Sequence, residues 1–285
     1  MTLAFAIAIA PSIAAADDDE APKAPGNPFY TLETKNLFGF LEGADVGEQG
    51  DRSLEFETTG SFGRQQGGYN SIEQEIIFEP TLTDSLGVEF GAHLLGQDIH
   101  GVPGLPDFAG VNFMGGSVEL RYVVMHRTAD LPIQLTVTAE PEYSVMADAG
   151  RQTNDYSTSF RAIADVISVD QRLYGAINLV YEPDGARLPG QPWQSTALLS
   201  ASAALSYRPT PALMFGGEAD YDRAYGGLVP RGFEGQAFYL GPTFHYQINE
   251  KIDLSAAFIA QTPFGRVDFE EFPRQLAKLR LEVEF

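Results

Sequence analysis

The sequence predicts an all-β protein, a single twelve-stranded antiparallel transmembrane β-barrel that follows an acidic N-terminal extension. Two patterns predict this fold. Segments of about ten residues alternate apolar and polar side chains from residue 52 onward, which is the period of a strand with lipid on one face and a polar interior on the other. The connections between these segments are short and long in turn, as in transmembrane barrels.

Composition limits the alternatives. The chain has 285 residues, a net charge of -21 and no cysteine. Without cysteine, neither a disulfide framework nor a thiol-ligated metal site is possible. The acidic balance argues against nucleic acid as a partner. No uninterrupted apolar run of about 18 residues occurs in the body of the chain, so the sequence predicts no membrane-spanning helix.

The N-terminal residues have the pattern of an export signal. A short apolar stretch, Leu3–Ile13, precedes three alanines, Ala14–Ala16, and then an acidic run. This order predicts a signal peptide over residues 1–16.

Residues 17–51 are acidic and rich in Pro and Gly, with an aromatic cluster at Phe38–Leu41. We interpret them as a periplasmic extension or plug at the mouth of a barrel formed by residues 52–285. The carboxylates between Asp45 and Asp51 suggest a calcium loop, but the segment lacks the distal Glu of an EF-hand. An acidic turn is therefore predicted, and neither a metal site nor a cofactor.

Each predicted strand is bounded by turn residues or by a longer polar segment. In order, the strands are Ser53–Phe62, Tyr69–Glu79, Gly87–Leu95, Gly116–Met125, Pro132–Tyr143, Ser159–Val169, Leu173–Glu182, Thr196–Tyr207, Ala212–Arg223, Gly235–Tyr246, Ile252–Gln261 and a last strand that ends at Phe285. The predicted tight turns are Thr83–Ser85, Thr128–Asp130, Asp170–Gln171, Arg208–Thr210 and Asn249–Glu250. The predicted long connections are Gln97–Gly110, Asp148–Tyr156, Pro183–Trp193, Ala224–Gly232 and Thr262–Pro273.

The last strand carries the most regular alternation. Ala277, Leu279, Leu281, Val283 and Phe285 share one face, and charged residues occupy the other. This pattern resembles the closing strand of Gram-negative outer-membrane β-barrels. The resemblance implies a location in the bacterial outer membrane, contact with lipid and lipopolysaccharide, and recognition by the barrel-insertion machinery through Leu279, Leu281, Val283 and Phe285.

The polar face of the strands is expected to enclose the lumen, because the apolar face must meet lipid. The predicted lumen-lining residues are Glu55, Glu57, Glu73, Glu75, Glu89, Glu119, Arg121, Glu140, Arg161, Asp165, Glu218, Asp220, Lys278 and Arg280. If the last strand pairs with the first, Lys278 and Arg280 should form ion pairs with Glu55 and Glu57 across the closing seam.

These residues include more acids than bases, so the lumen is expected to favour cations or neutral polar solutes. The layout is similar to transporter-type outer-membrane proteins of proteobacteria and to the barrels of meta-pathway phenol degradation. That resemblance implies a channel or transporter for small solutes, hydrophobic or aromatic ones included.

Two alternatives stay open from the sequence. One is a plugged barrel with a structural or partner-docking role, its lumen filled by ion pairs. The other is an outer-membrane lipid hydrolase. The sequence favours a protein that is not an enzyme, because none of the four histidines lies in a His-x-Ser motif, although a triad assembled in space stays possible.

Overall fold

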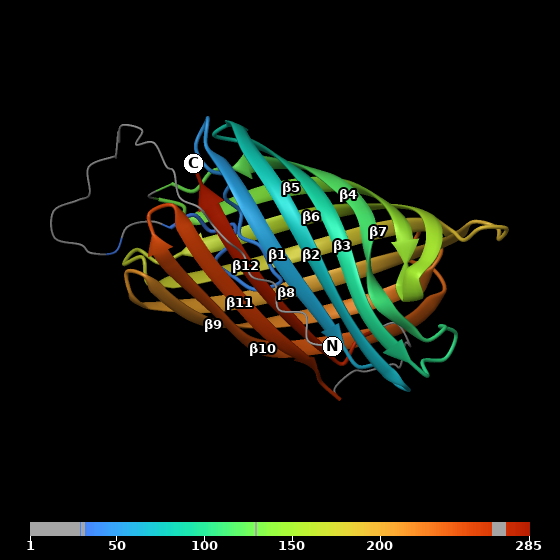
Figure 1. Ribbon diagram of the computed structural model, residues 1–285. Helices are drawn as coiled ribbons and strands as arrows, with labels where there is room; N and C mark the ends of the chain where they lie inside the picture. The colour runs from blue at the N-terminus through green and yellow to red at the C-terminus, as the bar shows by residue number, and fades with distance from the viewer. Residues whose placement is uncertain (1–28, 30–31, 129, 264–271) are drawn as a thin grey trace.

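Twelve antiparallel strands close into one barrel in the computed structural model, which describes residues 29, 32–128, 130–263 and 272–285. Each strand pairs with its neighbours in sequence, and β1 pairs with β12, so the predicted fold class is confirmed (Figure 1). The strands are β1 Arg52–Phe62, β2 Gly68–Thr83, β3 Leu86–His100, β4 Phe108–Met125, β5 Ile133–Ala147, β6 Arg151–Ile167, β7 Leu173–Arg187, β8 Gln194–Thr210, β9 Leu213–Gly226, β10 Phe233–Asn249, β11 Ile252–Gln261 and β12 Gln275–Glu284.

Side chains alternate between the two faces of the wall, and the apolar ones point outward. Ile72, Phe90, Leu120 and Phe215 are each about half exposed, whereas Glu55, Glu119 and Arg280 are buried on the inner face. This is the reverse of a soluble barrel, whose apolar residues fill the centre. Among the described residues, no helix is long and apolar enough to cross a membrane.

The two ends of the barrel differ in their connections. At one end, here called the turn end, β8 meets β9 across residues 211–212 and β10 meets β11 across residues 250–251. The closing strand also finishes there, where the C-terminus is marked (Figure 1). The Phe285 N–H donates to the Arg52 carbonyl at 3.0 Å, and the Phe285 ring stacks on Phe78. The opposite end is called the loop end. In outer-membrane barrels the short turns face the periplasm, so we expect the turn end of this barrel to face the periplasm.

Several strands are longer than the sequence predicted, toward the loop end. β3 runs to His100 instead of Leu95, and β4 begins at Phe108 instead of Gly116. The predicted long connection Asp148–Tyr156 is wrong: a three-residue 3-10 turn, Asp148–Gly150, joins β5 to β6. Apolar alternation marks only the part of a strand that meets lipid, so it ends before the hydrogen-bonded ladder does.

Two connections at the turn end are longer than predicted. Residues 168–172 separate β6 from β7, where the sequence suggested a tight turn at Asp170–Gln171. Residues 126–132 separate β4 from β5, where the sequence suggested a tight turn at Thr128–Asp130. The hydrogen bond from the Thr128 N–H to the Leu131 carbonyl shows that the turn lies inside this longer segment.

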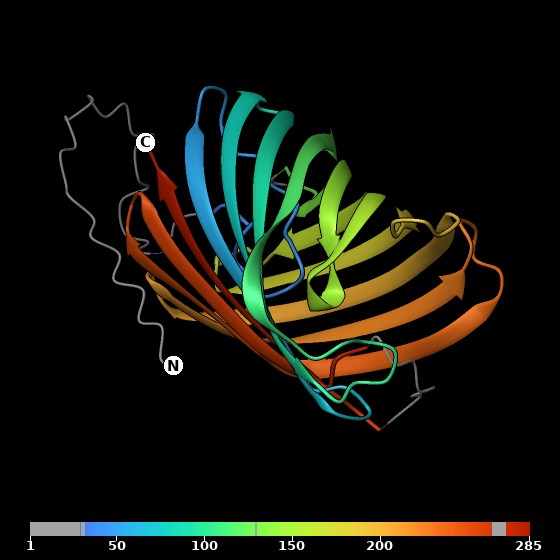
Figure 2. The same ribbon diagram turned by 45° about the vertical axis from the view of Figure 1, so that its right-hand side comes forward.

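The described residues from Leu32 to Val46 lie inside the barrel. From Leu32 to Asp51 the chain is an irregular coil; its first part lies within the turn-end half, enclosed by the strands, and residues 48–51 are exposed at the mouth (Figure 2). Phe38 and Ala44 are completely buried there. The predicted signal peptide and residues 17–28 lie outside the described residues.

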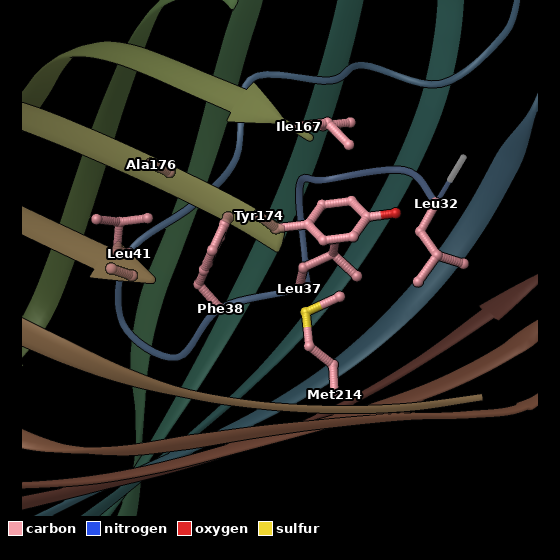
Figure 3. Close-up of a cluster of buried hydrophobic side chains, with 9 residues drawn as sticks. Leu32, Leu37, Phe38, Leu41, Ile167, Tyr174, Ala176 and Met214 are labelled. Carbon is pink, nitrogen blue, oxygen red and sulfur yellow. The ribbon is translucent and has the colours of Figure 1, made fainter. Parts of the chain in front are cut away.

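An apolar cluster holds this coil, called here the inner segment, against the wall. Leu37 and Phe38 lie beside Tyr174 of β7 and Met214 of β9 (Figure 3). The full cluster is Leu32, Leu37, Phe38, Leu41, Ile167, Tyr174, Ala176, Ala204 and Met214. The protein thus has an apolar core inside the barrel, formed by the inner segment and strands β6 to β9.

Candidate functional site: the interior of the barrel

The closing seam carries the ion pairs that the sequence predicted. Glu57 is directly opposite Arg280 in the β1–β12 ladder. Arg280 lies 2.8 Å from Glu55 and 2.7 Å from Glu57, and Lys278 Nζ lies 2.6 Å from Glu57. The inner segment joins this group, because Asn36 Nδ2 donates to Glu55 at 2.9 Å and to Glu282 at 2.8 Å.

Glu42 of the inner segment is the centre of a second network. Its carboxylate accepts from the guanidinium groups of Arg121 and Arg161, which come from β4 and β6. Burial would raise the pKa of Glu42, but these two arginines outweigh it and hold the pKa well below the usual value. Asn178 fixes the same residue from β7, accepting from the Glu42 N–H at 3.0 Å and donating to its carbonyl at 2.8 Å.

Lys35 is the cation that the inner segment supplies to the wall. It forms ion pairs with Glu79 and, at 2.8 Å, with Glu89. Burial would lower the pKa of Lys35, but the two carboxylates dominate and raise it well above the usual value. Two wall acids that would repel each other are therefore held together by one amine.

A third network surrounds Asp45. Gln134 donates to the Asp45 carboxylate at 2.6 Å, and Arg127 lies 3.4 Å from it and 2.5 Å from Asp165. Burial raises the pKa of Asp45, an effect that the Arg127 charge opposes. Asp165 in turn accepts from the Ala44 N–H at 2.9 Å, so the inner segment is bonded through both side chains and backbone.

Two glycines allow the inner segment to fit. A Cβ added at Gly39 would lie 2.3 Å from the Ala257 Cβ and 2.5 Å from Glu218 Oε2, and one at Gly43 would lie 2.2 Å from the Thr34 carbonyl oxygen. Glu218 receives hydrogen bonds from the N–H groups of Phe40 and Leu41. A larger residue at position 39 would clash with Ala257 and Glu218 and would push the inner segment away from the wall.

The loop-end half of the interior is different, because a group of its inward carboxylates forms no ion pair with an arginine or lysine among the described residues; Asp148, which lies 3.2 Å from Arg64, does not belong to that group. Several are half-buried on the inner face, and the hydrogen bonds they accept come mainly from hydroxyl groups, as Asp222 does from Ser200 at 2.5 Å. The members of this loop-end acidic group are Glu73, Glu75, Glu140, Glu142, Asp155, Glu182, Asp184 and Asp222.

One histidine lies within this group. His93 Nδ1 is 2.9 Å from Glu73, and Nε2 is 3.3 Å from Ser117 Oγ and 3.4 Å from Glu75. Gly91 leaves the space for these groups, since a Cβ there would lie 2.4 Å from both Glu75 and Ser117. The order Ser–His–Glu is that of a hydrolase triad. However, two carboxylates beside one imidazole favour its charged form, which cannot accept a proton from serine.

The sequence-predicted residues fall into four places. Glu55, Glu57, Lys278 and Arg280 form the seam. Glu89, Glu119, Arg121, Arg161, Asp165 and Glu218 contact or adjoin the inner segment. Glu73, Glu75 and Glu140 lie in the loop-end acidic group, and Asp220 lies between the two halves, opposite Ser202 and Tyr239.

Sequence reasoning missed the partners that come from outside the predicted strands. Lys35, Glu42 and Asp45 belong to the inner segment, and Asp155 and Asp184 belong to strand ends that were assigned to loops. The aromatic cluster at Phe38 was the one signal for the inner segment, and no pattern indicated which wall residues it would meet.

Comparison with solved structures places the chain among bacterial outer-membrane barrels. It is similar to the COG4313 outer membrane channel from Pseudomonas putida F1, with a TM-score of 0.58, 12% identity and coverage of 85% of this chain and 98% of that chain. The NanC porin gives a TM-score of 0.49 with 10% identity, covering 81% and 98%, and the KdgM porin gives 0.45 with 10% identity, covering 82% and 99%. At such identities the likeness concerns the fold.

This fold, together with the apolar exterior, assigns the protein to the bacterial outer membrane. No curated protein matches the chain. Residues 31–282 match the profile of a family of unknown function, DUF6662, and this match includes the inner segment, β1 to β11 and most of β12. The chain therefore belongs to the DUF6662 family.

Proposed function

We propose that the protein is an outer-membrane channel for small cationic or neutral polar solutes, with the inner segment acting as a plug at the turn end. The loop-end acidic group carries the proposal. Carboxylates that have no bound arginine or lysine raise the local concentration of cations and exclude anions.

The plug role follows from the contacts of the inner segment. A coil that fills the turn-end half, and that supplies both a cation and carboxylates to the wall, limits passage to small solutes unless it moves. The fold of the Pseudomonas putida channel supports a channel role for a barrel of this shape. We propose three partners: a small-molecule solute, the surrounding lipid with lipopolysaccharide, and the barrel-insertion machinery.

Planar-bilayer recording in a KCl gradient tests the selectivity. The reversal potential of the full-length mature chain should show a preference for K⁺ over Cl⁻. Combined substitution Glu140→Gln and Glu182→Gln should lower the preference at least about twofold, because each removes an inward carboxylate that forms no ion pair among the described residues. Anion preference in the unsubstituted protein would refute the proposal, and absence of any conductance would favour a sealed structural barrel.

A second candidate function, lipid or ester hydrolysis, is favoured by one observation, the Ser117–His93–Glu73 arrangement. We regard it as the weaker proposal because Glu75 shares the nitrogen that faces Ser117. An esterase assay with short-chain p-nitrophenyl esters tests it: activity that Ser117→Ala abolishes would establish the hydrolase.

A further inference from the structure

We propose that a small pocket at the turn end binds a primary ammonium ion. The pocket has a volume of about 140 Å³ and lies between the inner segment and the last strands of the barrel. Asn36 of the inner segment, His245 of β10, Asp253 of β11 and Glu282 of β12 line it. The role of this binding in transport rests on the proposed function, whereas the binding itself does not depend on it.

Three side chains in this pocket carry polar atoms that have no hydrogen-bond partner among the described residues. These atoms are Asn36 Oδ1, Asp253 Oδ1 and the ring nitrogens of His245, which is 3% exposed. The Asn36 amide is oriented by its Nδ2, which donates to Glu55 and Glu282, so its oxygen is the atom left over. Buried polar groups in native proteins are otherwise almost always satisfied.

The arrangement of these acceptors matches an N–H cation. His245 Nε2 lies 3.5 Å from Asp253 Oδ1, a separation at which the two do not hydrogen-bond to each other. A neutral imidazole offers one acceptor nitrogen, and an –NH₃⁺ group has three donors. One ammonium could therefore satisfy Asn36, Asp253 and His245 together.

The charge of the lining favours the same ligand. Glu33, Glu282 and Glu284 add carboxylates to the pocket, and its single amine, Lys35, is occupied by Glu79 and Glu89. Within the described part of the chain, no three His, Asp or Glu side chains are placed to hold a metal ion. An organic cation fits this site better than a bare metal.

The volume sets the size of the ligand. An engineered apolar cavity of about 150 Å³ in another protein accommodates benzene. A pocket of about 140 Å³ therefore admits a ligand of about six non-hydrogen atoms. n-Butylammonium is a suitable probe, because its neutral counterpart, 1-butanol, has nearly the same shape.

Calorimetric titration of the full-length mature protein in detergent tests the proposal. n-Butylammonium should bind at least tenfold more tightly than 1-butanol, which lacks the charge, and than tetramethylammonium, which lacks N–H donors. Equal affinity for tetramethylammonium would overturn the proposal, since a diffuse acidic surface would then account for binding.

Variants locate the site. Asp253→Asn should weaken n-butylammonium binding at least tenfold, whereas Asp130→Asn, at an exposed position between β4 and β5, should leave it unchanged. Should Asp253→Asn prevent barrel formation, Asn36→Leu in the inner segment replaces it, with the same tenfold loss expected. Unchanged affinity in a folded variant of either kind would overturn the proposal.

The two proposals fail separately. Cation preference in the bilayer without n-butylammonium binding would leave the channel intact and remove the pocket. Binding in a protein without cation preference would keep the pocket and remove the channel.

Discussion

In both halves of the barrel interior the wall carries carboxylates, but the two halves differ in what binds these carboxylates. In the turn-end half, Glu79 and Glu89 are bonded to Lys35, and Arg121 and Arg161 are bonded to Glu42. In the loop-end half, no arginine or lysine of the described chain forms an ion pair with a member of the loop-end acidic group, although Arg64 pairs with the neighbouring Asp148. The comparison shows that an acidic strand face does not reveal whether it lines an open passage or holds a plug; the partner segment decides.

Opening the turn end should produce the largest effect. Gly39→Ala places a Cβ 2.3 Å from Ala257 and 2.5 Å from Glu218, so the inner segment must leave its position. We expect single-channel conductance in planar bilayers to rise several-fold, because the plugged half then resembles the other.

Gly185→Ala is the matched control for this change. Gly185 lies in β7, and a Cβ there would meet nothing within 4 Å, so conductance should match the unsubstituted protein. An unchanged conductance in Gly39→Ala would contradict the plug assignment.

Removing the charge of Glu42 should have the next largest effect. Glu42→Gln leaves two buried guanidinium groups with less compensation, at a cost of about 3 kcal/mol to docking. The chain has no cysteine, so Ala44→Cys, at a fully buried position, reports undocking through its rate of thiol labelling. Labelling should accelerate at least tenfold in the double variant; a Cys at exposed Gln49 serves as the fast reference.

Lowering the pH to 5 should not release the inner segment as Glu42→Gln does. The lowered pKa of Glu42 means that its stabilisation is complete above the usual value of 4.5 and is lost only as pH falls through the lower folded value. Asp45 has a raised pKa, so its protonation does not oppose docking. Labelling of Ala44→Cys at pH 5, corrected for thiol ionisation, should equal that at pH 7, and faster labelling would contradict the Glu42 assignment.

The seam should respond more moderately and unequally. Arg280 is almost completely buried and forms ion pairs with both Glu55 and Glu57, whereas Lys278 is more exposed and forms its ion pair with Glu57. Arg280→Glu should lower the temperature at which the folded band disappears on an unboiled gel by several degrees, and Lys278→Gln should lower it less. Equal stability of both variants would show that the ion pairs do not hold β1 to β12.

A single loop-end carboxylate should give the smallest effect. Glu182→Gln alone removes one charge from a half whose other acids stay, so cation preference in bilayers should fall by less than about twofold. A complete loss of preference would instead assign the selectivity to Glu182 alone.

The wall of this barrel was predictable from the sequence, and its filling was not. Alternation in segments such as Leu279, Leu281 and Val283 is a local signal of period two, and it predicted the fold, the strand number and the pairing that brings Arg280 to Glu57. The strand ends that contain Asp155 and Asp184 were not predicted, because strand residues beyond the lipid are polar and show no apolar alternation.

The contacts of the inner segment were not predicted for a different reason. Thr34, Lys35 and Asn36 form no regular element, and their partners are dispersed over β1, β2, β3, β6 and β12. Contacts of an irregular coil with a tertiary surface have no period, so neither propensity nor pattern indicates them. The export signal and the role of the terminal residues in insertion stay predictions.

The bonds of Asn36 constrain the order of assembly. It contacts Glu55, 19 residues away, and Glu282, 246 residues away, so the inner segment cannot complete its contacts until the last strand is in place. Pairing over such a separation is slow. Sealing of the turn end is therefore tied to closure of the strand ring, and a barrel whose last strand has not yet paired should hold its plug incompletely.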